Sequence, residues 1–324
     1  MTMRLRMGAA ALLCLAAATP GAAEQPLSAP GPEGALAGTL VAPGEGRPLV
    51  LILPGSGPTD RDGNNPGGVT AAPYRLLAEA LAEDGVGTLR IDKRGIAGSR
   101  NAVYDPNAVT IADYVEDTRR WIAAARAETD VPCVWLLGHS EGGVIALAAA
   151  DAGVPDICGV LLVAAPGRGF ADVLREQLRA NPANAPILAE AEGAIAVLEA
   201  GNRVDATRLH PALQGMFSPS VQGFIIDLMA HDPAALAAKA EVPMLIVQGG
   251  RDMQVAQADG DALAAANPDA TYVTIADMNH VLKTVETDER QANMMAYVDP
   301  SRPVSPRLVA AILEFLAQQG AIRP

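Results

Sequence analysis

Short apolar runs recur along the chain and alternate with segments in which apolar residues return every three or four positions. Apolar runs without polar interruption are typical of strands that are buried on both faces of a sheet. The predicted strands span residues 38–41, 48–53, 86–91, 131–137, 157–164, 244–247 and 271–275. The predicted helices span residues 74–83, 109–127, 144–150, 255–266 and 306–318. This alternation predicts an α/β fold with a mostly parallel central sheet that is flanked by helices.

The alternation stops between residues 168 and 240, where the sequence shows only helical spacing. The helical stretches of this region span residues 170–180, 187–200 and 221–230. We expect the region to form a helical cap over the carboxyl edge of the sheet, so that residues 38–167 and 241–324 form the core. Residues 24–37 are rich in Pro, Gly and Ala, and we expect them to form a flexible leader.

The first 23 residues have the layout of a secretory signal peptide. Arg4 and Arg6 precede an apolar run over residues 8–18, which is too short to span a bilayer. Small residues at 21–23 provide a cleavage site after Ala23. A retained membrane anchor is the alternative. We expect a secreted or periplasmic protein without stable membrane insertion after cleavage.

Removal of residues 1–23 leaves two cysteines, Cys133 and Cys158. Each lies at the start of a predicted strand, so their sulfur atoms are close together if the two strands are parallel neighbours. A disulfide would then be compatible with an oxidising compartment. Two buried thiols that pack as small apolar side chains are the alternative, which we prefer.

Composition and charge exclude one class of partner. The chain has 324 residues, a formal net charge of −13 and a pI of about 4.7. No cluster of Lys and Arg provides the basic face that nucleic-acid binding requires, so we expect no nucleic-acid partner. No pattern in the sequence indicates an oligomeric state.

The candidate chemistry centres on the segment Gly138-His139-Ser140-Glu141-Gly142. A predicted strand leads into it and an Ala-rich helix follows, which is the context of a nucleophile elbow. The sharp turn strains the serine backbone, and a side chain at position 138 or 142 would crowd the neighbouring strand or helix. We predict that Ser140 is a nucleophile and that His139 points away from its side chain. A structural serine in a strand–helix turn is the alternative.

A serine hydroxyl is a weak nucleophile, and it needs a base and an acid that orients the base. In this fold the acid and then the histidine follow the serine along the chain. Asp252 follows the predicted strand at 244–247, and His280 follows the one at 271–275. We therefore predict Asp252 as the acid and His280 as the base. The alternatives are an Asp252 that only caps the next helix and a His280 that lies on the surface.

An oxyanion formed at Ser140 requires two backbone amides as hydrogen-bond donors. One is expected from Glu141, directly after the nucleophile. The other is expected from Ser56, with Gly57 as the second choice, in the turn that follows the strand at 48–53. A tight turn without a catalytic role is the alternative. This chemistry requires no metal ion and no organic cofactor.

Five segments resemble the α/β-hydrolase superfamily, and within it the secreted bacterial esterases and the serine-aminopeptidase-like hydrolases. They are residues 53–64, 90–95, 138–143, 249–252 and 278–283. The resemblance covers most of the chain from about residue 38 onward, and it implies the α/β-hydrolase fold with a Ser–Asp–His triad. The chain differs at Pro54-Gly55, where many relatives have His-Gly. The predicted cap resembles the family least, so the resemblance implies no particular substrate.

These features predict hydrolysis of a small-molecule carboxylic ester through an acyl-enzyme. Because the predicted cap is apolar, we expect a substrate with a modest apolar acyl or alcohol part. A peptidase that trims a short peptide from its N-terminus is the second hypothesis, and it requires an anionic site for the substrate's ammonium group. The acidic residues that the cap offers for this are Glu176, Glu190, Glu192, Glu199 and Asp205. A non-catalytic binding protein that keeps the fold is the third hypothesis.

Overall fold

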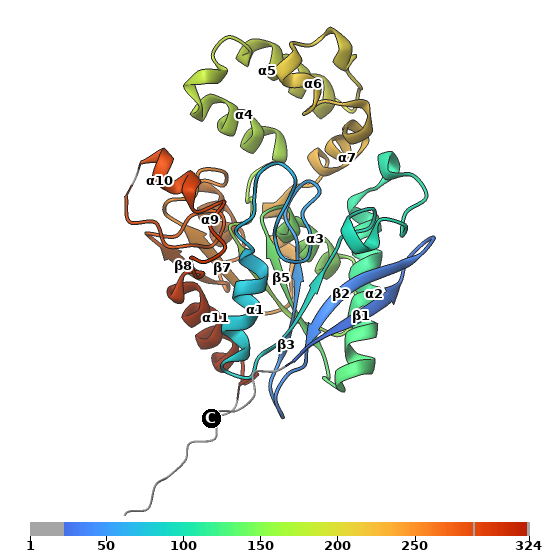
Figure 1. Ribbon diagram of the computed structural model, residues 1–324, viewed down its shortest axis with the longest axis vertical. Coiled ribbons are helices and arrows are strands. Elements are labelled where there is room, and N and C mark those ends of the chain that lie inside the picture. The colour runs from blue at the N-terminus through green and yellow to red at the C-terminus, as the bar shows by residue number, and fades with distance from the viewer. Residues whose placement is uncertain (1–22, 288, 323–324) are drawn as a thin grey trace, which may run out of the picture.

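The computed structural model describes residues 23–287 and 289–322, and in them an eight-stranded sheet with helices on both faces (Figure 1). The strands are β1 (Glu24–Pro30), β2 (Ala35–Val41), β3 (Leu49–Leu53), β4 (Gly87–Ile91), β5 (Val134–His139), β6 (Ile157–Val163), β7 (Met244–Gly249) and β8 (Thr271–Ile275). Their order across the sheet is β1-β2-β4-β3-β5-β6-β7-β8. β2 is antiparallel to both of its neighbours, and the strands from β4 to β8 are parallel. This is the α/β-hydrolase fold that the sequence predicted.

Outside the cap, helices alternate with strands along the chain. Inside the cap, helices follow one another without a strand between them. They are α1 (Pro73–Ala82), α2 (Ile111–Thr129), α3 (Glu141–Asp151), α4 (Phe170–Ala180), α5 (Leu188–Glu199), α6 (Pro211–Gln214), α7 (Pro219–Met229), α8 (Pro233–Lys239), α9 (Gln257–Ala266), α10 (Arg290–Met295) and α11 (Pro306–Gln318). Four short 3-10 turns join them among the described residues: η1 (Ala97–Ser99), η2 (Pro106–Ala108), η3 (Pro182–Asn184) and η4 (Ala206–Arg208).

Side chains from the two faces of the sheet form separate apolar layers. Along β3, Leu49, Leu51 and Leu53 pack with α2, α3, α8 and α9, whereas Val50 and Ile52 pack with α1 and α11. Successive side chains of a strand point to opposite faces, so a strand covered on both sides is apolar throughout. The central strands are therefore rigidly fixed, and they carry the loops at their carboxyl ends.

The N-terminal part of the described chain corrects one expectation. Residues 24–37 do not form a flexible leader, because they contribute β1 and the start of β2, which pair in an antiparallel register. Proline is tolerated there because β1 is an edge strand. Ala29 is buried in the core and Leu27 packs against it, which fixes the hairpin to the sheet. The predicted signal peptide, apart from Ala23, lies outside the described residues.

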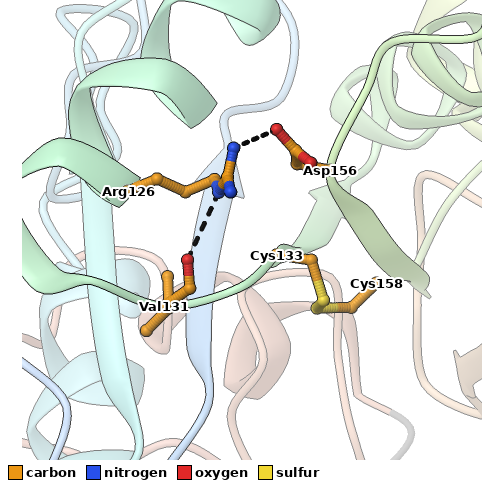
Figure 2. The surroundings of a disulfide bond; sticks show 5 residues. All are labelled: Arg126, Val131, Cys133, Asp156 and Cys158. Atoms are coloured by element: carbon orange, nitrogen blue, oxygen red, sulfur yellow. Dashed lines mark hydrogen bonds and ion pairs between the residues drawn. A yellow bond between two sulfur atoms is a disulfide. The ribbon is translucent and has the colours of Figure 1, made fainter.

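The two cysteines correct a second expectation. Cys133 and Cys158 form a disulfide, with their Cα atoms 5.3 Å apart, and they are not separate buried thiols (Figure 2). They precede or open the parallel neighbours β5 and β6, so the sheet register places them side by side. Beside them, Arg126 binds the carboxylate of Asp156 and donates from Nε to the carbonyl of Val131 at 3.3 Å.

Helices occupy the region that the sequence predicts as a cap, and residues 168–240 contain no strand. α4 to α7 lie over the carboxyl edge of the sheet (Figure 1). Their apolar side chains form a small cluster of their own, which includes Leu174, Ile195 and Phe217. The sequence predicted α4, α5 and α7 but not the short α6 and α8, which both begin with proline. Among the described residues, no helix has the length and apolarity needed to cross a membrane.

Candidate active site

The loops after β3, β5, β7 and β8 meet in one cavity of about 190 Å³ beneath the cap. The carboxyl ends of parallel strands lie at the same edge of a sheet, which is why segments far apart in sequence converge there. Ser56, Ser140, Glu141 and His280 line this cavity. The structure thus brings the predicted nucleophile, base and oxyanion-hole residues to one place. Asp252 lies behind His280.

Ser140 stands on the turn between β5 and α3 with φ 54° and ψ −126°. This conformation is costly for a residue with a side chain, and such strain occurs where the surrounding structure enforces it. A Cβ atom placed on Gly138 would collide with the carbonyl of Gly142, and one on Gly142 would collide with the carbonyl of Leu53. The expectation that both positions require glycine is therefore confirmed, and the elbow presents Ser140 toward the cavity.

Asp252 and His280 form a hydrogen-bonded pair, with 2.8 Å between Oδ2 of Asp252 and Nδ1 of His280. The Asp252 side chain is fully buried and that of His280 is 6% exposed. The other carboxylate oxygen, Oδ1, accepts from the amides of Gln254 and Val255 at 2.7 and 2.9 Å. Asp252 thus binds the histidine and also closes its own turn, but it does not cap the next helix, which was the alternative from the sequence. α9 begins later, with Ala256 as its N-cap.

The turn after β3 packs directly against the elbow. A Cβ atom placed on Gly55 would lie 3.3 Å from the Cβ of Ser140. The carbonyl of Ser56 accepts from the hydroxyl of Thr59 at 2.8 Å, which fixes the turn. Within the described part of the chain, the amides of Ser56 and Glu141 donate to no protein acceptor. Both amides are therefore available as donors at the cavity wall, beside the nucleophile.

His139 joins two of the converging loops, a role that the sequence did not reveal. Its Nε2 lies 2.8 Å from the carbonyl oxygen of His280, and its Nδ1 lies 2.8 Å from the hydroxyl of Tyr74. The Tyr74 hydroxyl also accepts from the amide of Gly55 at 3.0 Å. The only available signal was the histidine beside Ser140 in the elbow, together with a tyrosine at the start of α1.

The charge state of His139 follows from its surroundings. Burial, together with the positive charge that His280 can carry, lowers the pKa of His139 to about 3, so the ring is neutral near pH 7. A carbonyl can only accept, so Nε2 carries the proton and donates to His280. Nδ1 then accepts from Tyr74. The chain of donors runs from the Gly55 amide through Tyr74 and His139 to the backbone of the loop that carries His280.

A buried ion pair lies beside the turn after β3, which carries Gly55 and Ser56. Nζ of Lys93, in the loop after β4, is 2.9 Å from Oε1 of Glu141 and 2.7 Å from the carbonyl oxygen of Gly55. Both charged side chains are at most 4% exposed. The sequence placed Lys93 in a segment that resembles the superfamily but assigned it no role. The side chain of Glu141 is thus bound by Lys93, while Glu141 itself lines the cavity.

The cap contributes Phe170, Val173 and Leu228 to the apolar part of the cavity wall. Arg168, which also lines the cavity, is bound by Asp259 and Glu176 at 2.7 and 2.5 Å.

The acidic residues considered for an ammonium site lie elsewhere. None of them lines the cavity, and each has a hydrogen-bond or ion-pair partner. The pairs are Glu176 with Arg168, Glu190 with the amide of His210, Glu192 with Arg179, Glu199 with Arg175 and Asp205 with Thr207. In the described residues, no group of three or more His, Cys, Asp or Glu side chains could hold a metal ion.

The sequence profile of the family described as Hydrolase_4, serine aminopeptidase S33, matches residues 67–288. The matched segment contains Ser140, Asp252 and His280. The chain belongs to this family. This S33 chain is 27% identical over 242 residues to the esterase EstD of Thermotoga maritima, an alignment that covers 72% of the chain and 54% of EstD. It therefore spans about half the length of this curated relative.

Solved structures show the same fold for this S33 family member. An esterase of Pyrococcus furiosus superposes with a TM-score of 0.58 at 15% identity, covering 95% of this chain and 96% of that one. A hydrolase of Pseudomonas aeruginosa superposes with a TM-score of 0.55 at 22% identity, covering 90% and 98% of the two chains. At these identities the likeness concerns the fold alone.

Proposed function

We propose that this protein is a serine hydrolase that cleaves carboxylic esters through an acyl-enzyme on Ser140. The observation that carries the proposal is the hydrogen-bonded pair of Asp252 and His280, because His280 lines the same cavity as the strained Ser140. The name of the relative EstD, an esterase, supports the ester as the substrate class.

The hydrogen bonds assign a role to each group. Because Nδ1 of His280 donates to Asp252, Nε2 is left to take the proton of the Ser140 hydroxyl. Ser140 then attacks the ester carbonyl, and the amides of Ser56 and Glu141 stabilise the oxyanion. His280 returns the proton to the leaving alcohol. Water, activated in the same way, releases the acid and restores the serine.

The cavity favours a short, apolar substrate. Its volume of about 190 Å³ is below the range of pockets that enclose drug-sized ligands. Apolar side chains of the cap and of α3, among them Phe170, Leu228 and Val144, contact whatever occupies it. We therefore infer an ester with a short acyl chain, whose remaining part extends out of the cavity.

An N-terminal peptidase is the second candidate, because the family is described as a serine aminopeptidase. The cavity speaks against it, since the one acidic side chain among its described lining residues is Glu141, which is bound to Lys93. An ammonium group would find no free carboxylate there. Hydrolysis of p-nitrophenyl esters of graded chain length, measured beside aminoacyl p-nitroanilides, separates the two candidates.

The Ser140→Ala variant tests the proposal. We expect it to lose p-nitrophenyl acetate and butyrate hydrolysis by more than about 10⁴-fold and to lose labelling by a fluorophosphonate. Ser28→Ala is the matched control, because it removes the hydroxyl of an exposed serine on β1 that does not line the cavity. If the folded wild-type protein resists the probe and hydrolyses no ester, the non-catalytic binding protein becomes the better hypothesis.

We further infer that the protein is exported and acts in the periplasm or outside the cell. The signal-like residues 1–23 support this, and so does the disulfide between Cys133 and Cys158, because disulfides persist in oxidising compartments. N-terminal sequencing of the protein recovered from the periplasm or medium should begin at Glu24. A protein that keeps its first residues and stays with the cytoplasmic fraction would contradict export.

A further inference from the structure

Lys93 is a buried cation that does not itself line the cavity, as far as the described residues show. It contacts two residues that do, Gly55 and Glu141. We propose that Lys93 is a positioning residue that fixes the two backbone amides of the oxyanion hole relative to each other. The proposal rests on the serine-hydrolase function proposed above and extends it to a residue that never touches the substrate.

The first amide is fixed through the peptide bond between Gly55 and Ser56. This bond is trans and planar, so the carbonyl of Gly55 and the amide of Ser56 point in opposite directions. Lys93 binds that carbonyl at 2.7 Å. When the carbonyl is held toward the buried ammonium, the Ser56 amide is turned away from it, on the side of the cavity that Ser56 lines.

The second amide is fixed through a side chain. The carboxylate of Glu141 binds the same ammonium at 2.9 Å, and the backbone amide of Glu141 is the one directly after Ser140. One ammonium therefore connects the turn after β3 to the first turn of α3. An oxyanion hole works only when its donors are preorganised about one point, and this connection sets the spacing of the two donors.

The ammonium is held on several sides. Burial by itself lowers the pKa of Lys93, but the neighbouring Glu141 carboxylate reverses this, and the net shift is upward, so Lys93 stays charged. Two acceptors bind it, and its third side faces the ring of Tyr114, with Nζ 5.4 Å from the ring centroid. A charge with this many partners at 4% exposure has little freedom to move.

The test uses the variants Lys93→Met and Lys93→Met/Glu141→Gln. The double variant leaves no unpaired buried charge, so it keeps the test open if the single variant does not fold. We expect kcat for a p-nitrophenyl ester to fall about 10- to 100-fold, with KM within about twofold of wild type. The inhibition constant of a trifluoromethyl ketone, whose adduct with Ser140 carries an oxyanion, should rise by the same factor.

Arg94→Met/Asp117→Leu is the matched control. It removes the buried ion pair between Arg94, the next residue of the same loop, and Asp117 of α2. Within the described chain, neither residue forms a hydrogen bond or ion pair with Gly55 or Glu141. We expect it to lower the melting temperature but to leave kcat and the ketone's inhibition constant within about twofold of wild type, because the oxyanion donors keep their positions.

The outcomes separate the two proposals. A folded double variant that keeps wild-type kcat and ketone affinity would overturn the role of Lys93 alone. The same holds if the variant loses no more activity than the Arg94 control. A wild-type protein that neither hydrolyses an ester nor reacts with a fluorophosphonate would instead overturn the serine-hydrolase function.

Discussion

The floor of the cavity and the cap above it are stabilised by different forces. The floor consists of the loops that carry Gly55–Ser56, Ser140–Glu141, Asp252 and His280, and buried hydrogen bonds fix each of them. The cap helices α4 to α7 pack around an apolar cluster of their own and carry ion pairs at the surface, whereas α8, which ends the cap region at residues 168–240, packs with the core of the sheet. Hydrogen bonds are directional, whereas apolar packing is tolerant of shape.

This difference suggests a division of labour. A fully paired buried polar network has one arrangement, so the floor can hold reacting groups within the narrow limits that catalysis requires. An apolar cluster accepts substitutions of similar volume at modest cost. The cap can therefore change its contact with the substrate without disturbing the chemistry below. Changes in the floor should act on kcat, and changes in the cap should act on substrate choice.

Among the residues that support Ser140, the largest effect is expected from Asp252→Asn. The variant keeps the shape of the side chain but removes the charge that orients His280, so kcat should fall about 10⁴-fold while KM changes little. Initial rates with p-nitrophenyl butyrate measure this. Asp117→Asn, which alters a buried carboxylate of α2 that does not line the cavity, should retain most of the activity. If kcat of Asp252→Asn falls less than about tenfold, the floor does not hold His280 in the way proposed.

The disulfide lies at the amino ends of β5 and β6, opposite the carboxyl ends that carry the cavity. Removing it tests whether that end of the strands matters for catalysis. Replacing both cysteines with serine removes a link between residues separated by 25 positions, which should lower the free energy of unfolding by about 3 kcal/mol. Urea unfolding measures this loss. Because the link lies at the start of β5 and β6, kcat at 25 °C should be unchanged. The reduced wild type should unfold like the variant, and a large fall in kcat would contradict this account.

His139 should make the stability of the floor depend on pH. The folded state keeps His139 neutral down to about pH 3, whereas the unfolded state binds a proton below about 6.5. Between these values the unfolded state holds one more proton, so stability falls as the pH falls, by about 1.4 kcal/mol per pH unit. His139→Gln should reduce this slope in urea unfolding between pH 6.5 and 4.5. His210→Gln, at an exposed cap position, is the control, and equal slopes in all three proteins would contradict the prediction.

The smallest effect is expected in the cap, and it concerns selectivity. Leu228→Ala shortens a buried side chain of the cavity wall and so enlarges the cavity. The ratio of kcat/KM for p-nitrophenyl hexanoate to kcat/KM for p-nitrophenyl acetate should therefore rise about tenfold. Leu198→Ala removes an equally buried side chain from the cap cluster, away from the cavity, and should leave the ratio unchanged. A similar change of this ratio in both variants would show that the packing of the whole cap sets selectivity, and not the contact of Leu228 with the substrate.

The fold could be predicted from the sequence because its signals are local. Buried strands such as residues 49–53 are apolar throughout, and Gly138 and Gly142 flank a serine that follows a strand and opens a helix. The order of Ser140, Asp252 and His280 along the chain then places all three at one sheet edge. Residues 38–41 were predicted as a strand, but the rest of the hairpin at residues 24–41 was not, because its prolines suggest a loop and its pairing depends on the edge of the sheet.

The supporting network could not be predicted, because it depends on distances between segments. Lys93 and Glu141 are 48 positions apart, and Tyr74 and His139 are 65 apart. Nothing in the local sequence shows that a lysine after β4 binds a carbonyl after β3. The disulfide was considered but not preferred for the same reason, since its formation depends on β5 and β6 being neighbours.

The central claim is that the hydroxyl of Ser140 is the nucleophile of a hydrolase. The direct test is to react the folded protein with a fluorophosphonate, digest it and locate the added mass by peptide sequencing in a mass spectrometer. We predict one adduct, on Ser140, which is absent from the Ser140→Ala variant and from protein denatured before the reaction. An adduct on another residue, or equal labelling of wild type and Ser140→Ala, would contradict the claim.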